Sequence, residues 1–366
     1  MSAAHPGAVE GPVLVIGTGL IGASIALALT RASVPVLLAD VDEDNLRIAV
    51  EAGAGRAVAA DDAPALVIVA VPPRHAAEVL AQASARYPGA TLTDVTSVKR
   101  GVIADAVARG ADQARLVGGH PMAGREVSGS AGARKELFDD RLWVLTPLAA
   151  TGEEHRERVH RLVETCGAVP VEMTLEEHDS AVALVSHTPQ VLSSILAGQL
   201  VGSDADAVQI AGQGLRDMTR IAASNVAMWS DILGANAGPV ADVLDGVIAD
   251  LERTRLALRE LAAGDAQGDA PVRAVLESGV AGQARIPGKH GEARRQFREV
   301  TVQIADKPGE LGRLFSAVAV AQVNLEDIRI EHVLGRPSGL VELFVQPESA
   351  DRLVEALQAL SFDVRG

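Results

Sequence analysis

The sequence predicts an α/β protein of three successive parts: an N-terminal doubly wound parallel sheet, an all-helical middle and a small C-terminal unit of mixed strands and helices. Three observations carry this prediction. Short apolar runs alternate with helical patterns over residues 11–173, as in βαβ units. Residues 174–262 show helical spacing and no strand pattern. Residues 297–366 return to strands, now with two helices among them.

The composition limits the classes of partner. The 366 residues suggest two or three domains, and their cores must be aliphatic because 48% of residues are hydrophobic but only 2% aromatic. A formal net charge of −15 argues against nucleic acid and anionic membranes as partners. The start shows no signal-peptide pattern and no apolar run approaches about 20 residues, so we expect no membrane span.

The chain contains a single cysteine, Cys166. One cysteine excludes an internal disulfide and fits the reducing cytoplasm, where we place the protein. We interpret Cys166 as a small buried apolar residue rather than a nucleophile. We predict no metal site.

The first predicted strand runs directly into a glycine-rich turn. The apolar run Val13–Ile16 is followed by Gly17-Thr18-Gly19-Leu20-Ile21-Gly22 and a helical stretch, and a second apolar run, Val36–Ala39, ends in Asp40. Strand, G-x-G-x-x-G, helix, strand and acid together form the dinucleotide-binding (Rossmann) unit. The glycines allow the tight turn, the approach of a pyrophosphate and close packing of the helix, whose first N–H groups attract phosphate.

Asp40 indicates which dinucleotide is bound. Its carboxylate would accept hydrogen bonds from the ribose hydroxyls and repel a 2′-phosphate, and no Arg or Lys occurs in residues 41–44. The sequence therefore favours NAD over NADP. The predicted cofactor-binding residues are Gly17, Thr18, Gly19, Leu20, Ile21, Gly22, Asp40 and Val71.

The rest of the first part continues the alternation. We expect helices over 44–52, 75–86, 100–109 and 153–165, and strands over 65–71, 91–95, 116–117, 142–145 and 169–173. Ligands of such sheets bind beyond the carboxyl ends of the strands. Asp94 to Ser97 and His120 each follow a strand. They are therefore a candidate reaction centre beside a nicotinamide.

The helical part offers a histidine and two arginines. A helical pattern over 175–200 contains Ser186-His187-Thr188-Pro189, and a proline inside a helix removes a hydrogen bond and clashes with the preceding turn. A kink beside His187 suggests function, while a tolerated bend or a break between two helices explains it equally well. A second pattern, over 215–224, places Arg216 and Arg220 one turn apart on one face.

The last third of the chain changes character twice. Residues 263–296 contain six glycines and little periodicity, which predicts a linker. After it, the order strand, helix, strand, strand, helix, short strand is typical of a ferredoxin-like βαββαβ unit. The expected elements are 298–304, 310–321, 325–332, 339–346, 349–360 and 362–364.

Several motifs in order resemble those of the prephenate/arogenate dehydrogenases of tyrosine biosynthesis. Besides the glycine turn they are Asp94-Val95-Thr96-Ser97-Val98-Lys99, Gly118-Gly119-His120-Pro121-Met122-Ala123-Gly124, Glu176-Glu177-His178-Asp179, Val185–Pro189, Gly212–Ala222 and Met228-Trp229-Ser230-Asp231. The match spans residues 13–262. Residues 297–366 are similar to an ACT regulatory module.

The resemblance implies an NAD-dependent oxidative decarboxylation of prephenate to 4-hydroxyphenylpyruvate. The hydroxyl of prephenate becomes acidic as hydride leaves its carbon, so a base must bind it, and histidine suits that task at neutral pH. By resemblance and by its place after a strand, His120 is this base, and Ser97 orients the histidine or the hydroxyl. Arg220 matches the family arginine that binds a substrate carboxylate, for which its guanidinium fork is suited.

Other residues carry weaker assignments. His187 aligns with a histidine of the family's substrate pocket, and Glu126 and Asp217 are further candidates for substrate binding, as are Arg216 and Lys99. His178 and Trp229 are as readily structural as functional, and Asp94 is expected to bond the backbone near its strand end.

Two departures from the family leave the substrate open between prephenate, our first choice, and arogenate. A second histidine often stands three residues after His187, where this chain has Gln190, and Arg125 replaces a smaller residue. The two substrates differ in the side chain, a ketone against an ammonium, near which both departures are expected.

The ACT resemblance implies an effector, expected to be tyrosine or phenylalanine, and feedback regulation; a tail that only stabilises the oligomer is the alternative. The family also implies a homodimer through the helical part. The predicted effector-binding residues are Asp306, Pro308, Gly309, Glu310, Leu311 and Asn324.

Three rival functions remain at this point. A homoserine dehydrogenase shares the architecture but uses lysine and aspartate, and a 3-hydroxyacid dehydrogenase relies on a helix lysine and lacks the tail. A non-catalytic sensor of NAD and an amino acid would bind the cofactor without turnover. Such a sensor would have no need of Ser97, His120 and Arg220 together.

Overall fold

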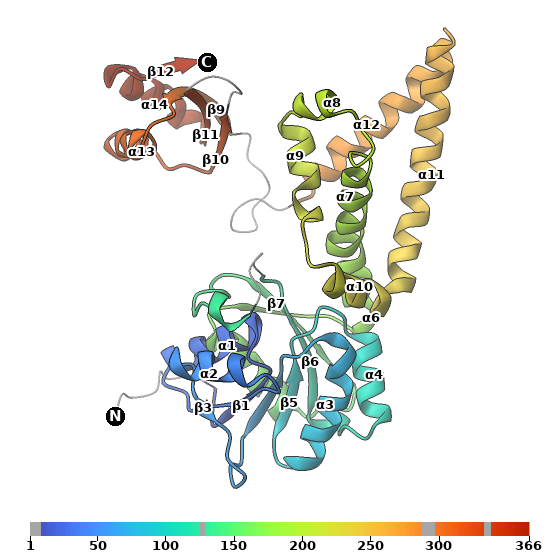
Figure 1. The fold of residues 1–366 in the computed structure, drawn as a ribbon, viewed down its shortest axis with the longest axis vertical. Coiled ribbons are helices and arrows are strands. Elements are labelled where there is room, and N and C mark those ends of the chain that lie inside the picture. The colour runs from blue at the N-terminus through green and yellow to red at the C-terminus, as the bar shows by residue number, and fades with distance from the viewer. Residues whose placement is uncertain (1–8, 125–128, 287–296, 333–337, 366) are drawn as a thin grey trace. The chain divides into compact units, whose positions relative to one another are not determined.

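A computed structural model describes residues 9–124, 129–286, 297–332 and 338–365 (Figure 1). The chain divides into two compact units, 1–247 and 248–366.

The first unit is built on an eight-stranded sheet with strand order β3-β2-β1-β4-β5-β6-β7-β8. Every neighbouring pair is parallel except β6 and β7, which are antiparallel. The expected doubly wound, mostly parallel sheet is confirmed. The strands are β1 (Val13–Ile16), β2 (Val36–Ala39), β3 (Arg56–Ala57), β4 (Leu66–Val69), β5 (Thr91–Asp94), β6 (Leu116–Pro121), β7 (Leu142–Pro147) and β8 (Val169–Glu172).

Helices cover both faces of this sheet because its central strands are apolar on both sides. Side chains of one parity, such as Val13 and Val15, pack under α1 (Leu20–Arg31), α2 (Glu43–Glu51) and α5 (Glu153–Thr165). The alternate side chains, such as Leu14, pack under α3 (Pro73–Arg86) and α4 (Arg100–Ala108). Alternation along each strand thus builds two aliphatic cores. Short 3₁₀ turns occupy Gln113–Arg115 and Ser130–Gly132.

The helical segment begins with α6 (Leu175–Val182), whose first turn is fixed by a capping box between Thr174 and Glu177. A π-helical turn, Ala183–His187, joins α6 to α7 (Thr188–Gly198) without a break. Pro189 lies in the first turn of α7, directly after the π turn, where a proline is tolerated because the first N–H groups of a helix have no partner in that helix. His187 is therefore the last residue of a π turn, a feature often found at functional sites.

One later helix of this segment is shorter than its pattern predicts. The helix expected over 215–224 ends at Thr219, so Arg220 lies in a following 3₁₀ turn rather than on one helical face with Arg216. The elements are α8 (Ala205–Gln209), α9 (Gln213–Thr219), the 3₁₀ turn η4 (Arg220–Ala222), α10 (Val226–Ala235) and α11 (Ala237–Ala262).

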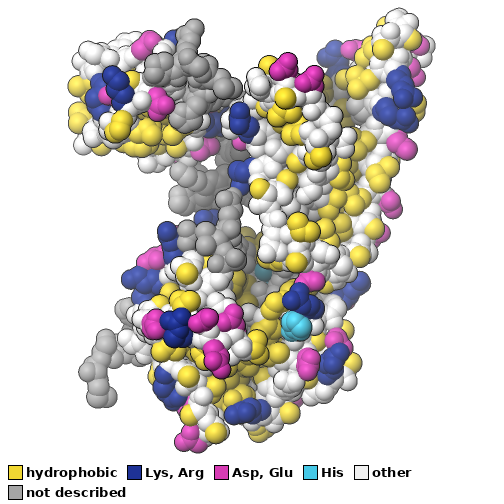
Figure 2. Space-filling model, in the orientation of Figure 1, with side chains coloured by type: hydrophobic (Ala, Val, Ile, Leu, Met, Phe, Trp, Pro, Cys, Tyr) yellow, Lys and Arg dark blue, Asp and Glu magenta, His cyan; other side chains and the backbone are white. Residues whose placement is uncertain are grey.

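The helical segment exposes an unusual amount of apolar surface. Hydrophobic side chains are spread over its visible face in Figure 2, and several are more than half exposed. By length and composition, Leu175–Gly198 could cross a membrane, and the bent pair α10–α11 could be a second such segment. Core helices of soluble proteins meet the same criterion, so the expectation that the chain has no membrane span stays a prediction. Examples more than half exposed are Leu184, Val185, Ile195, Val201, Ile210, Met218, Val226 and Leu251.

A helix occupies much of the segment predicted as a linker, which is a correction. The 3₁₀ turn Ala266–Gly268 leads into α12 (Asp269–Ala284). A side chain at Gly268 would collide with the carbonyl oxygen of Ala257, so this glycine marks a close approach to α11. Gly279 and Gly282 lie inside α12, where each costs about 1 kcal/mol relative to alanine, and this is why the segment resembles a loop. The other domain limits stay a prediction.

The C-terminal part of the second unit has the expected βαββαβ order. Its sheet order is β10-β11-β9-β12, and all its pairs are antiparallel. Alternate residues of β9 and β11 form one apolar core with the two helices. The elements are β9 (Arg298–Ala305), α13 (Glu310–Val320), β10 (Asp327–His332), β11 (Ser338–Val345), α14 (Pro347–Ala359) and β12 (Asp363–Arg365).

Candidate active site

The glycine turn between β1 and α1 has the geometry that a dinucleotide requires. Gly17 has φ +98°, and a side chain there would strike the backbone of Ala70. On Gly19, by contrast, nothing lies within 4 Å of where a Cβ would stand, so the space beside the N-terminus of α1 is open. The first N–H groups of that helix have no partner within the helix. Val71 lies at the edge of the same turn, 3.1 Å from the position of a Cβ on Gly17.

Asp40 is held beside this turn by three hydrogen bonds. Its Oδ2 accepts from the backbone N–H of Thr18 at 2.5 Å and from the Thr18 hydroxyl at 2.8 Å. Its Oδ1 accepts from the backbone N–H of Asp42 at 2.9 Å. A carboxylate has about four acceptor sites, so one remains for a ribose hydroxyl. The residues present therefore fit NAD.

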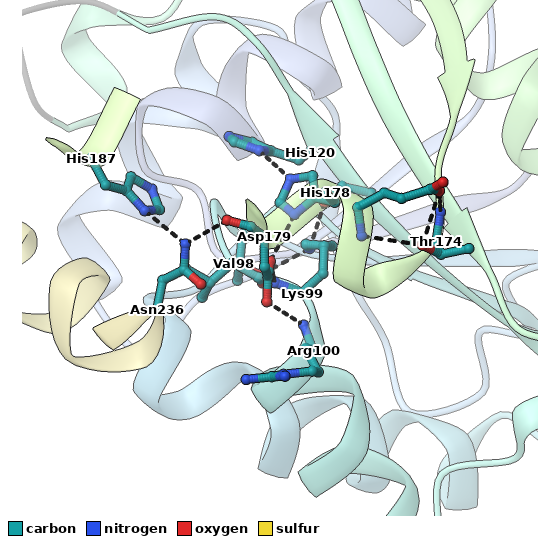
Figure 3. Close-up of polar contacts among 12 residues, drawn as sticks. Val98, Lys99, Arg100, His120, Thr174, His178, Asp179, His187 and Asn236 are labelled. Atoms are coloured by element: carbon teal, nitrogen blue, oxygen red, sulfur yellow. Dashed lines mark hydrogen bonds and ion pairs between the residues drawn. The ribbon is translucent and has the colours of Figure 1, made fainter. Parts of the chain in front are cut away.

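Three side chains form a hydrogen-bonded chain at the carboxyl end of the sheet (Figure 3). Asp179 Oδ1 lies 2.8 Å from His178 Nδ1, and His178 Nε2 lies 2.8 Å from His120 Nδ1. His178 and Asp179 come from α6, whereas His120 comes from β6. His178 and Asp179 are buried and His120 is partly exposed, so the chain ends at the accessible imidazole.

The ionisation state of Asp179 decides which nitrogen of each histidine donates a hydrogen bond and which accepts one. Burial pushes the pKa of its carboxyl upward, but hydrogen bonds from His178 and from the backbone N–H groups of Lys99 and Arg100 outweigh it, and the pKa is lowered. The ionised carboxylate only accepts, so His178 donates from Nδ1 and accepts at Nε2. His120 must then donate from Nδ1, and its Nε2 carries the lone pair.

Burial lowers the pKa of His120 well below its usual value, and His178, Lys99 and His187 add to the effect. The His120 ring is therefore neutral at pH 7. A neutral imidazole whose free nitrogen is fixed by a hydrogen bond on the other nitrogen can act as a general base.

His187 belongs to a neighbouring cluster. The Asn236 side-chain Nδ2 lies 2.8 Å from the Asp179 carbonyl oxygen and 3.0 Å from His187 Nδ1. The ring of Trp229 meets His187 edge to face, with centroids 6.1 Å apart. Burial lowers the pKa of His187 to about 4. Both histidines predicted for the site are thus linked to Asp179 through one intervening side chain, His120 through His178 and His187 through Asn236.

Lys99 and Asp94 form a buried ion pair beside Gly119, the residue that precedes His120. The ammonium also donates to the Thr96 hydroxyl at 3.0 Å and to the Gly119 carbonyl at 2.6 Å. Asp94 accepts from the backbone N–H groups of Thr96 and Gly119, at 2.9 and 3.2 Å, which fulfils the expectation that it bonds the backbone. Burial lowers the pKa of Lys99, while the adjacent Asp94 opposes that shift.

The remaining predicted residues lie at other points of the fold. Ser97 is half-buried between Asp94 and Lys99, in the segment that follows β5. Arg220 and Asp217 are exposed on η4 and α9, which both pack against α7, and Asp217 accepts from Gln213 at 2.9 Å. Glu126 and Arg125 lie outside the described residues.

The structure does not bring the predicted effector residues together within one chain. Asp306 to Leu311 connect β9 to α13, with Gly309 at φ +95° capping the helix. Asn324 precedes β10, at the opposite end of the sheet, because Asp327 pairs with Phe344 whereas Ala305 pairs with Ser338. The eight residues of β9 separate the two ends by about 23 Å.

Sequence reasoning missed Asp179 and Asn236 and left His178 undecided. The available signal was a histidine followed directly by an aspartate, just after a capping box. Cys166 is fully buried, and burial raises the pKa of its thiol to about 12, as expected for an apolar core residue.

Comparison with known proteins identifies the family to which this chain is similar. Residues 25–172 match the family model described as prephenate dehydrogenase, nucleotide-binding domain, and residues 174–269 match prephenate dehydrogenase, dimerization domain. The exposed apolar helices between residues 184 and 251 fall within the second match.

Relatives match over nearly the whole chain. The probable prephenate dehydrogenase NovF of Streptomyces niveus is 36% identical, covering 94% of this chain and 97% of its own length. The prephenate dehydrogenase of Bacillus subtilis is 28% identical, covering 94% and 95%. The crystal structure of prephenate dehydrogenase from Aquifex aeolicus with hydroxyphenyl propionate and NAD⁺ matches with TM-score 0.65 and 29% identity, covering 74% of this chain and 96% of that one.

Proposed function

The chain belongs to the prephenate dehydrogenase family, and we propose that it oxidises prephenate with His120 as the general base. The overall reaction converts prephenate and NAD⁺ to 4-hydroxyphenylpyruvate, carbon dioxide and NADH. The observation that carries the assignment is the chain Asp179–His178–His120, which leaves the Nε2 lone pair of His120 free.

Each step assigns a task to a residue of this chain. NAD⁺, when bound, accepts the hydride from the ring carbon that bears the hydroxyl. His120 Nε2 takes the hydroxyl proton as that oxygen becomes a carbonyl, and loss of carbon dioxide then makes the ring aromatic. Ser97, in the segment after the neighbouring strand, orients the hydroxyl or the imidazole. His178 stabilises the imidazolium that forms on His120.

The cofactor is held by the glycine turn and Asp40. The N–H groups at the start of α1 would hold the pyrophosphate, and the Asp40 carboxylate would accept hydrogen bonds from the ribose. The open space at Gly19 supports this assignment.

The substrate carries two carboxylates in a protein of net charge −15, so it needs cations at the site. We assign one carboxylate to Arg220, whose fork can bind it through two parallel hydrogen bonds. His187, Asp217 and Glu126 complete the proposed substrate residues. The support is that α7, which follows His187 directly, packs against η4 and α9.

The test is NADH formation at about 340 nm (the absorbance of reduced nicotinamide) from purified full-length protein, comparing prephenate with arogenate and NAD⁺ with NADP⁺. Turnover of prephenate with NAD⁺ is expected. Binding of NAD⁺ without turnover of either substrate would contradict the proposal and favour a sensor.

Arogenate is the second candidate because of Gln190. This side chain is buried on α7, with Nε2 and Oε1 each 3.4 Å from a serine hydroxyl, those of Ser194 and Ser224. Because these contacts are long, the Gln190 Oε1 could instead accept a hydrogen bond from the ammonium group of arogenate. Turnover of arogenate alone would indicate that Gln190 and Arg125 determine the choice of substrate.

We also propose a homodimer formed through the helical segment, in a cytoplasmic enzyme. Large exposed apolar side chains on these helices, among them Leu184 and Val185, support it because water-exposed patches of this kind mark interfaces. Analytical ultracentrifugation should give twice the mass of the 37.9 kDa chain, and a monomer at micromolar concentration would contradict it.

The C-terminal βαββαβ part is proposed to act as an ACT-type site for tyrosine or phenylalanine. Asp306 to Leu311 and Asn324 stand at opposite ends of one sheet, so a site using both sets needs two copies of the chain. Tyrosine should inhibit the wild type, and Asn324→Ala should weaken inhibition without changing basal turnover. Equal inhibition of both would exclude Asn324 from the site.

A further inference from the structure

We propose that Lys99, together with Asp94, is a positioning residue for His120. Where the pairing of β5 with β6 ends, the two side chains bond the N–H and the carbonyl of Gly119, and Lys99 thereby holds the carbonyl of the peptide bond to His120. The inference rests on the proposed role of His120 as the base.

The need for such a pair comes from the strand register. β5 pairs with β6 only at Leu92↔Leu116 and Thr93↔Val117. β6 continues to Pro121 and pairs on its other side with β7. Beyond Val117, the backbone groups that face β5 therefore lack a strand partner, and buried backbone groups require one.

Asp94 and Lys99 supply the missing partners. The Gly119 N–H donates to Asp94 Oδ1 at 3.2 Å, and the Gly119 carbonyl accepts from Lys99 Nζ at 2.6 Å. One carboxylate and one ammonium thus replace the carbonyl and the N–H of a neighbouring strand. The held carbonyl belongs to the peptide bond of His120 itself.

Lys99 cannot be the group that reacts. Its side chain is fully buried, and its three donors face three protein acceptors: the Asp94 carboxylate, the Thr96 hydroxyl and the Gly119 carbonyl. No N–H remains for a substrate. This argues against the rival functions in which a lysine carries the chemistry.

The fit requires glycine at the held position. A Cβ on Gly119 would lie 2.6 Å from the Asp94 carbonyl oxygen and 3.1 Å from both Thr93 Oγ1 and Trp143 Nε1. Any larger residue would move β6 away from the pair. This gives a physical reason for a glycine directly before the catalytic histidine.

Lys99 also contacts the chain that ends on the His120 ring. Its backbone N–H donates to Asp179 Oδ1 at 2.8 Å, the same oxygen that accepts from His178 (Figure 3). One residue therefore holds the backbone of His120 through its ammonium and the ring of His120 through Asp179 and His178.

The test compares Lys99→Met with the double variant Asp94→Asn/Lys99→Met in the full-length protein. Methionine keeps the length of the lysine but removes its donors. The double variant also removes the carboxylate charge, so no unpaired charge stays buried. Lys135→Met, at an exposed lysine of the same unit, is the matched control.

We expect kcat per NAD⁺-binding site to fall about 10²-fold in both variants, as for a misplaced catalytic group. The Kd for NAD⁺ and the KM for prephenate should change less than about threefold, and the control should match the wild type. A double variant that binds NAD⁺ and keeps wild-type kcat would overturn the inference. Loss of NAD⁺ binding in both variants would also overturn it, because the pair would then serve folding.

A parallel His120→Asn variant separates the two proposals. If His120→Asn keeps its activity, the proposed function fails. If His120→Asn is inactive while the double variant is fully active, only the inference about Lys99 fails.

Discussion

His120 Nδ1 lies 2.8 Å from His178 Nε2, and the two rings meet edge to face at 71°. The contact joins β6 to α6, and it sets which nitrogen of His120 carries the lone pair. Because Asp179 holds His178 from the far side, a proton that arrives on His120 is stabilised by a hydrogen bond and by a carboxylate beyond it. In the proposed mechanism, Asp179 and His178 together would perform the task of the aspartate that orients a catalytic histidine in hydrolases.

Replacing His120 should abolish the base but leave the cofactor site intact. We expect His120→Asn to lower kcat by at least about 10²-fold with little change in the Kd for NAD⁺. Steady-state NADH formation and NAD⁺ titration measure the two quantities. His160→Asn, at a histidine of α5 bonded to Glu172 of β8, is the control and should stay active. Near-normal turnover of His120→Asn would remove the base assignment.

Replacing Asp179 should impair catalysis through His178. The variant Asp179→Asn keeps a side-chain oxygen that can accept from His178, but its neutral amide stabilises the imidazolium less, so kcat should fall about tenfold or more. The change should also cost about 1 kcal/mol of stability, because Asp179 accepts from the first N–H groups of α4. Comparing kcat per NAD⁺-binding site with urea unfolding separates the two effects. Loss of stability with unchanged kcat would leave Asp179 a purely structural residue.

Replacing Arg220 should weaken substrate binding. Arg220→Gln removes the proposed partner of a substrate carboxylate and should raise the KM for prephenate at least about tenfold, with a smaller effect on kcat. The matched control is Arg259→Gln, on α11. An unchanged KM would exclude Arg220 from the substrate site.

Replacing Asp40 should relax cofactor choice. Asp40→Ser removes the charge that repels a 2′-phosphate and the acceptor held by Thr18. The ratio of kcat/KM for NAD⁺ to that for NADP⁺ should fall at least about tenfold. If the ratio did not change, a residue other than Asp40 would set the preference.

Acid should destabilise the first unit through its buried histidines. Burial lowers the pKa of His187 to about 4, from 6.5 in the unfolded chain. The unfolded state therefore binds the extra proton between these values, so this stabilisation is complete above pH 6.5 and is lost as pH falls toward 4. His120 and His155, whose pKa values burial also lowers, act in the same direction.

The expected loss from His187 alone is about 2 kcal/mol between about pH 7 and pH 5. Urea unfolding at the two pH values measures it, with His187→Gln as the variant that should lose part of the slope. Carboxyls such as Asp62, whose pKa the Arg56 hydrogen bond lowers to about 2, contribute only at lower pH. Identical slopes in both proteins would contradict the assignment to His187.

The fold was predictable where local signals agree. Apolar runs indicated the strands of the first sheet, the G-x-G-x-x-G turn indicated the junction of β1 and α1 in a nucleotide-binding domain, and the βαββαβ order indicated the last part. The prediction failed at α12, because glycines that suggest a linker lie inside a helix. The prediction that Arg220 shares a helix with Arg216 also failed, because α9 ends at Thr219, one residue before Arg220.

The sequence by itself determined the residue types at the site, since His120, Ser97 and Lys99 stand at or just after the ends of strands of a parallel sheet. Only the tertiary structure decided which groups these side chains contact. His178 lies 58 positions beyond His120 and Asp179 follows it, and no local pattern reveals that α6 delivers them to its ring. Likewise, the proposed role of Lys99 depends on the pairing of β5 with β6, which ends at Val117 and does not reach Gly119. The physical reason is that a hydrogen bond depends on distance in space, whereas sequence periodicity reports only which face of an element is buried.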